Sequence, residues 1–273
     1  MSYDYNDKNN PFETGNSSYR NSPFAQTGNP FGQTQNPYGT QGPEAFYEAG
    51  TRDSLSTYIA KTYLWMFAGL MITFLVALGM AASGLVYRMF MGGGSAVLIV
   101  CTIAELAVVI ALSARIHKMS PSAAGAMFFI YAALTGVTFS MYFVLFDLTI
   151  LTAAFGATAL FFGGMAAVSL IFKMELDTIR PFLFGGLIFL LVFGLLSLIF
   201  GLEAFQIGVC YIGIAVFLGY TAYDTSKIRA NYQFYAHDAA LLKKASIFSA
   251  LQLYLDFINL FLYILRILGR RSK

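Results

Sequence analysis

Seven uninterrupted apolar segments constrain the fold of this 273-residue chain more than any other feature. Each is long enough to cross the roughly 30 Å hydrocarbon core of a bilayer, which takes about 20 helical residues. Apolar residues occupy all sides of the segments, which favours helices over the alternating strands of an outer-membrane barrel. The segments span approximately residues 58–83, 95–114, 123–146, 150–172, 181–202, 205–226 and 246–268.

The composition indicates the same fold class. Asp, Glu, Lys and Arg make up 11% of the chain, against about 25% in soluble domains, and the mean hydropathy is +0.65. We therefore exclude a soluble protein and predict an all-α polytopic membrane protein. Its partner is the lipid bilayer, and we expect no nucleic-acid partner.

The chain divides into a polar tail, residues 1–54, and a seven-helix transmembrane domain, residues 55–270. The tail is nearly free of aliphatic residues and holds five of the seven prolines, so we expect it to be disordered. A turn-forming pair followed by one aromatic recurs in it as Asn10-Pro11-Phe12, Ser22-Pro23-Phe24, Asn29-Pro30-Phe31 and Asn36-Pro37-Tyr38. These units are either docking elements for a partner or repeats in a low-complexity linker.

Basic residues in the short loops predict the orientation. Ten of them fall on one side, which favours a cytoplasmic N-terminus: Arg52, Lys61, Arg115, Lys118, Lys173, Arg180, Lys227, Arg229, Lys243 and Lys244. Seven crossings place the basic C-terminus, with Arg270 and Arg271, outside. A re-entrant last segment would avoid this conflict, but residues 246–268 are long enough to span, and we favour a crossing.

Three acids remain inside the apolar segments: Glu105, Asp224 and Asp256. An ionised carboxylate in hydrocarbon costs about 2.5 to 3.5 kcal/mol on insertion scales, so it persists when it is paired, protonated or in contact with water. These three acids are the leading functional candidates.

The last segment carries a polar stripe that contains the deepest of these acids. The stripe recurs at spacings of four, three, four and three residues, which places it on one helical face: Gln252, Asp256, Asn259, Tyr263 and Arg266. Lipid would expel such a face. We therefore expect the last helix to be enclosed by the others.

A similar stripe, Tyr220, Asp224, Lys227 and Asn231, ends the sixth segment. If the two stripes face each other, Asp224 and Asp256 share one site and lose their protons in separate, coupled steps. The pair would then respond to pH. In the alternative, Asp224 is a solvated helix end paired with Lys227 or Arg229, and Asp256 is a hydrogen-bonded structural acid.

Arg115 lies ten residues after Glu105, about 80° around the helix and about 15 Å along it, so the two do not pair directly. Arg115 either reaches a carboxylate on another helix or anchors the cytoplasmic end. No metal-ligand spacing or enzyme motif occurs in the sequence, and both cysteines fall in apolar segments. We expect no cofactor and no enzymatic activity.

Three stretches resemble the signature of the Bax inhibitor-one/YccA-like family of membrane proteins, over about residues 55–270. They are Tyr223-Asp224-Thr225-Ser226-Lys227-Ile228, Leu253-Tyr254-Leu255-Asp256-Phe257-Ile258-Asn259-Leu260-Phe261 and Leu265-Arg266-Ile267-Leu268-Gly269. The resemblance implies a seven-helix bundle around a central seventh helix, and we expect the membrane to be a bacterial plasma membrane. It also implies a pH-sensitive calcium leak governed by an aspartate pair, whose positions Asp224 and Asp256 occupy.

The family further uses an arginine at the end of the second helix to latch one of those aspartates. Arg115 is the best candidate, although, counted from Glu105, it falls one residue before the expected place, which Ile116 fills.

Two functions follow as hypotheses. In the first, Asp224 and Asp256 are proton sensors and transient calcium ligands in a cation pathway, supported by the polar residues Gln252, Asn259 and Tyr263. In the second, the chain regulates a membrane protease or quality-control complex through its tail and cytoplasmic loops.

Overall fold

A computed structural model describes residues 54–271, apart from 94, 116–117, 173–175 and 202–204, and these residues belong to one compact unit. Every regular element in this described part is helical. The predicted disordered tail lies outside the described residues. The helices are α2 (Leu55–Ala82), α3 (Leu85–Gly93), α4 (Ser95–Arg115), α5 (Pro121–Phe139), α6 (Tyr142–Leu145), α7 (Leu148–Phe172), the 3-10 turn η3 (Asp177–Ile179), α8 (Arg180–Phe200), α9 (Gln206–Tyr235) and α10 (Ala239–Arg271).

Six helical stretches in the described part are long and apolar enough to cross a membrane, and they contain α2, α5 with α6, α7, α8, α9 and α10. The chain is therefore an integral, multi-pass membrane protein. Local signals start two of these helices. Ser54 accepts a hydrogen bond from the backbone N–H of Thr57, and Ser120, followed by Pro121, accepts one from Ala123.

Helices α9 and α10 extend beyond the apolar segments 205–226 and 246–268. α9 continues to Tyr235, and α10 begins at Ala239, so that only a short turn separates them. Apolarity marks where a helix lies in the bilayer, whereas a helix ends where its backbone is capped. Helix-forming residues carry both helices beyond their apolar parts.

The short helix α3, Leu85–Gly93, was also missed. It follows Gly84, whose φ of 69° lies in the left-handed region that glycine adopts without strain. This turn ends α2 and allows a new helix to start within three residues.

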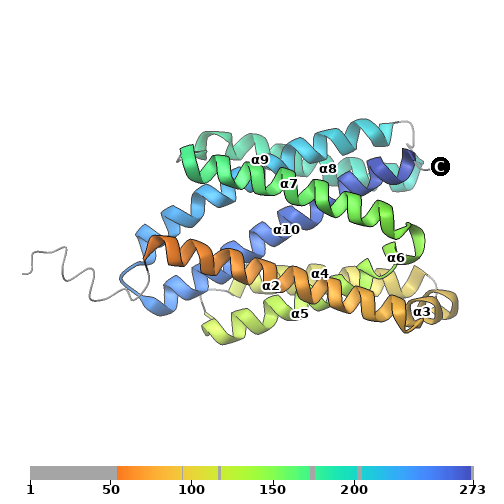
Figure 1. Cartoon of the computed structure of the whole chain (residues 1–273), viewed down its shortest axis with the longest axis horizontal. Coiled ribbons are helices and arrows are strands. Elements are labelled where there is room, and N and C mark those ends of the chain that lie inside the picture. Colours follow the sequence, from red (N-terminus) through yellow and green to blue (C-terminus); the bar gives the residue numbers. More distant parts are fainter. Residues whose placement is uncertain (1–53, 94, 116–117, 173–175, 202–204, 272–273) are drawn as a thin grey trace, which may run out of the picture. The chain divides into compact units, whose positions relative to one another are not determined.

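α10 occupies the centre of the helical unit. It packs against α9, α2, α7 and α5, and 67% of its most apolar stretch is buried within the protein. Figure 1 shows α10 between two groups of helices, with α2, α4 and α5 on one side and α7, α8 and α9 on the other. This confirms that the last segment is enclosed by its neighbours.

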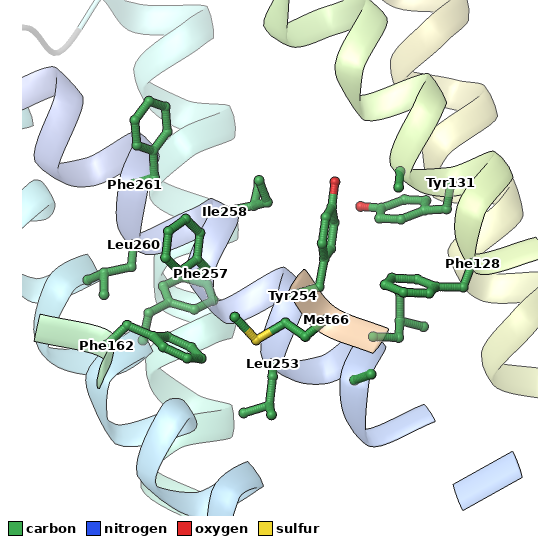
Figure 2. Close-up of a cluster of buried hydrophobic side chains, with 14 of the residues drawn as sticks. Met66, Phe128, Tyr131, Phe162, Leu253, Tyr254, Phe257, Ile258, Leu260 and Phe261 are labelled. Atoms are coloured by element: carbon green, nitrogen blue, oxygen red, sulfur yellow. The ribbon is translucent and has the colours of Figure 1, made fainter. Parts of the chain in front are cut away.

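Aromatic contacts hold α10 to both groups. Tyr254 packs edge-on against Phe128 and Tyr131 of α5, with ring centroids 5.6 and 5.8 Å apart. Phe257, nearly one turn later, contacts Phe162 of α7 at 5.5 Å. Figure 2 shows these side chains on opposite sides of the α10 ribbon. Since lipid supplies little hydrophobic drive for helix association, such packing stabilises the bundle.

Candidate functional site

A cavity of about 740 Å³ lies between facing stripes of α9 and α10. α8 and α4 add further wall residues. Because the end of α4, the start of α8 and the turn-proximal parts of α9 and α10 line the same space, the cavity lies at one end of the bundle. It is lined by Ser113, Arg180, Pro181, Phe184, Tyr220, Tyr223, Asp224, Lys227, Asn231, Tyr235, Leu241, Lys244, Ala245, Phe248 and Gln252.

Asp224 lines this cavity, and Asp256 lies buried behind it, outside the lining. The side chain of Asp224 lies close enough to that of Asp256 on α10 for the two carboxyl groups to interact electrostatically. The two residues are only 5% and 4% exposed. A hydrogen bond between two carboxyl groups requires a proton on one of them, since an ionised carboxylate only accepts. The structure therefore brings the two acids close together in a buried position.

One oxygen of this pair has no partner. Oδ2 of Asp256 is buried and accepts no hydrogen bond within the described part of the chain. On the Asp224 side, Gln252 donates from Nε2 to Oδ1 across 3.4 Å. The pair thus keeps unused acceptor capacity, which a proton, a water molecule or a cation can take up.

A tyrosine from a third helix stands beside the pair. Tyr63 of α2 lies close enough to Asp256 for the two to interact electrostatically. Its hydroxyl also shares a 3.0 Å hydrogen bond with Thr225, the residue after Asp224. α2 therefore contacts both sides of the pair, and Tyr63 belongs to the site although its segment shows no sequence signal for this role.

Buried hydroxyl groups hold the surrounding helices in register. Thr62 of α2 shares a 2.9 Å hydrogen bond with Ser246 of α10. Asn231 of α9 donates to Ser249 of α10 at 3.0 Å. Such bonds contribute about 0.6 kcal/mol each in membranes, and they set the rotation of the helices on which the acids stand.

The two basic residues next to Asp224 on α9 have direct partners elsewhere, although the charge of Lys227 still acts on Asp224. Lys227 forms an ion pair with Asp177, and Arg229 donates to the backbone carbonyl of Leu170 at 3.2 Å. Asp224 is buried against α10. The interpretation of Asp224 as a solvated helix end is thus not the geometry observed.

The polar stripe of α10 divides into two parts. Gln252 and Asp256 lie at the carboxyl pair, whereas Asn259 donates to the carbonyl of Leu255 on its own helix at 2.8 Å. Tyr263 stacks on Phe217 of α9, with centroids 5.9 Å apart. Only the first part of the stripe reaches the cavity.

Glu105 and Arg115 lie apart from the pair. Glu105 is half-buried between α4 and α5, where it accepts a 2.9 Å hydrogen bond from Thr138. Arg115 is exposed at the end of α4. Ser113, two residues earlier, supplies the α4 contribution to the cavity lining.

The donor set around the pair is small for a metal ion. Within the described residues, no group of three or more His, Cys, Asp or Glu side chains is placed to hold a metal ion. Two carboxyl groups and one amide provide hard oxygen atoms but too few ligands for a closed calcium site, which takes six to eight.

Comparison with known proteins assigns the chain to a family. A family model described as "Inhibitor of apoptosis-promoting Bax1" matches residues 55–273. The chain belongs to this Bax inhibitor family. The match covers the whole helical part, including both aspartates, and confirms the resemblance inferred from the sequence.

Bacterial relatives share most of their length with this chain. The inner membrane protein YbhL of Escherichia coli is 41% identical over 221 residues, which cover 81% of this chain and 94% of YbhL. A protein of Deinococcus radiodurans is 36% identical over 233 residues, 84% of this chain and 96% of its own. The protein RP147 of Rickettsia prowazekii is 31% identical over 219 residues, 80% and 92% of the two chains.

Proposed function

We propose that the chain forms a pH-sensitive leak pathway for cations, with calcium as the transported ion, in a bacterial inner membrane. The observation that carries this proposal is the buried carboxyl pair, in which Asp224 lines a cavity at one end of the bundle and Asp256 lies behind it. The family membership and the membrane location of YbhL support the setting.

The position of the pair links it to both proton and cation chemistry. Carboxylates deep in a membrane protein are costly unless they are paired, protonated or in contact with water. Here the cavity gives water and protons access to Asp224, while Asp256 lies behind it without a lysine or arginine partner of its own in the described structure.

Protonation then controls the pathway through charge. With one shared proton, the pair has a single negative charge and a hydrogen bond that ties α9 to α10. When this proton leaves, the bond is lost, the two carboxylates repel each other, and the site gains oxygen ligands for a divalent cation. The leak must therefore change with pH.

The proposed topology has seven crossings around a central α10. α4 is 21 residues long, which corresponds to about 31 Å of helix, so we add it to the six apolar spans. The cavity end then coincides with the basic loops, and the positive-inside rule places it in the cytoplasm, with the N-terminus.

A flux assay tests the proposal. The purified full-length protein is reconstituted in liposomes that contain a calcium dye, and the leak is measured across pH for the wild type, Asp224→Asn and Asp256→Asn. We expect the pH dependence to disappear in both variants, because an amide cannot release the shared proton.

Asp147→Asn is the matched control, since Asp147 is an exposed acid between α6 and α7. It should retain the wild-type pH profile. A calcium leak whose pH dependence survives unchanged in both pair variants would refute the mechanism.

A further inference from the structure

The outer part of the cavity is positively charged, which a cation pathway alone does not explain. Arg180, Lys227 and Lys244 line it from three different helices, α8, α9 and α10. Among the described lining residues, Asp224 is the only acid. An excess of one sign of charge in a cavity concentrates ions of the opposite sign, so these three cations attract anions.

The lining side chains suit a phosphate group in particular. The planar guanidinium of Arg180 matches phosphate oxygens with two parallel N–H donors, and a lysine ammonium adds a mobile point charge. Lys227 now pairs with Asp177, but that carboxylate is 73% exposed. Exposed ion pairs contribute little free energy, so an anion in the cavity can compete for this lysine.

The cavity wall leads directly to a lipid-facing surface. Pro181 and Phe184 of α8 line the cavity beside Arg180, and Phe184 is 60% exposed. The exposed apolar side chains continue along α8 through Ile188 and Leu191. A phospholipid can therefore place its phosphate at Arg180 while its acyl chains lie along α8.

The size of the cavity agrees with such an occupant. Its volume of about 740 Å³ lies within the range of about 300 to 1,000 Å³ for small-molecule sites. Anionic lipids of the cytoplasmic leaflet are attracted to basic residues near the surface. The bilayer therefore supplies the ligand at high local concentration.

We propose that this cavity is a binding site for a phosphate-bearing anionic ligand, with the headgroup of an anionic phospholipid as its occupant, held by Arg180, Lys227 and Lys244. The site shares its cavity with Asp224 but uses other side chains, and its occupancy does not require cation transport. A bound headgroup neutralises the entrance and covers the approach to Asp224.

Native mass spectrometry of the purified full-length protein tests the site without a flux measurement. The protein is equilibrated with equal amounts of phosphatidylglycerol and phosphatidylcholine, and the ratio of the two retained lipids is measured. We expect the wild type to retain phosphatidylglycerol preferentially. In the double variant Arg180→Gln/Lys244→Gln this preference should fall about tenfold, because two of the three cations are gone.

The matched control removes the same charge from the same end of the bundle but outside the cavity. Lys118 and Lys243 are exposed and do not line the cavity. Lys118→Gln/Lys243→Gln should change the ratio less than about twofold. Equal losses in the two double variants would overturn the proposal, because the preference would then reflect surface potential alone.

Two further arms complete the test. Each single variant, Arg180→Gln and Lys244→Gln, should lose about threefold, which keeps the test open if the double variant does not fold. Inorganic phosphate is titrated into protein in pure phosphatidylcholine. Phosphate binding with the same variant dependence supports the site with a soluble ligand. If the protein shows no preference for phosphatidylglycerol and also binds no phosphate, the proposal is overturned.

Discussion

Helices α8 and α10 cross the same membrane but differ in hydropathy and in how much of each is buried within the protein. The membrane-spanning stretch of α8 has a mean hydropathy of 2.2 and only 11% of it is buried within the protein. That of α10 has a lower hydropathy of 1.6, and 67% of it is buried. The more apolar helix is thus the one that faces lipid, and the more polar helix is the one that other helices surround.

The difference shows how a bilayer distributes polar residues. Lipid cannot satisfy a hydrogen-bonding group, so the surface of a membrane protein must be apolar, whereas helix contacts can supply partners. From Pro181 to Leu196, α8 contains no charged or amide side chain. α10 holds Gln252, Asp256 and Asn259 within two turns, enclosed by its neighbours.

The largest expected effect comes from removing an aromatic ring from each helix. Tyr254 of α10 is fully buried and also shares a 2.7 Å hydrogen bond with Thr73. Tyr254→Ala should lower the free energy of unfolding by about 3 to 5 kcal/mol. Phe182→Ala on α8, at 81% exposure, should change it by less than about 0.5 kcal/mol. Reversible unfolding in mixed micelles measures both, and similar losses would contradict the comparison.

Adding an acid to α8 and removing one from α10 tests how polarity affects the insertion of each helix into the membrane. Leu191 is exposed near the middle of α8, so Leu191→Asp should disfavour insertion of this segment by about 2.5 to 3.5 kcal/mol. Asp256→Leu should favour insertion of the α10 segment by a similar amount. A translocon reporter that carries each segment gives both values, with Leu191→Ala as the control. If Leu191→Asp inserted like its parent, lipid exposure would not explain the composition of α8.

Two glycines offer a smaller test. A Cβ added at Gly213 would lie 2.7 Å from the ring of Tyr263 on α10, whereas one at Gly194 on α8 would meet nothing within 4 Å. Gly213→Ala should therefore destabilise the protein by about 1 to 3 kcal/mol. Gly194→Ala should be neutral or stabilise it by up to about 1 kcal/mol. Thermal unfolding compares the two variants. A larger loss of stability in Gly194→Ala than in Gly213→Ala would contradict the close packing of α9 against α10.

The smallest effect concerns the start of each helix. Asp238 accepts hydrogen bonds from the backbone N–H groups of Leu241 and Ala240 at the start of α10. The Leu241 bond, followed by the Ala240 bond, holds the pKa of Asp238 below its usual value. No side chain caps the start of α8 in the described structure.

Because folding lowers the pKa of Asp238, the direction in which its contribution to stability changes with pH is defined. The cap stabilises α10 at pH values above the unfolded pKa of about 3.9, and this contribution is lost as the pH falls through the lowered folded value. Asp238→Ala should thus slightly lower the melting temperature at neutral pH, with the difference vanishing in acid. Asp238→Asn should keep the cap at all pH values. A constant difference between wild type and Asp238→Ala down to the most acidic pH would argue against this.

Much of the site was predictable because its residues lie on periodic stripes. The spacing of Tyr220, Asp224, Lys227 and Asn231 predicted one face of α9, and all four line the cavity. Tyr63 and Arg180 were not predictable as site residues. Tyr63 reaches the pair only through the rotation of α2, and Arg180 reads as an ordinary basic residue at a helix start.

The sequence by itself determined the membrane class, the approximate helices and the polar faces, because a bilayer restricts each crossing segment to an apolar helix with few exceptions. Only the tertiary structure decided which polar faces meet. The contacts of α10 with α9 and α2 bring Asp224, Asp256 and Tyr63 together. Glu105 lies elsewhere, between α4 and α5, and accepts a hydrogen bond from Thr138. Helix rotation and register depend on side-chain packing between segments far apart in the chain, and no local spacing encodes them.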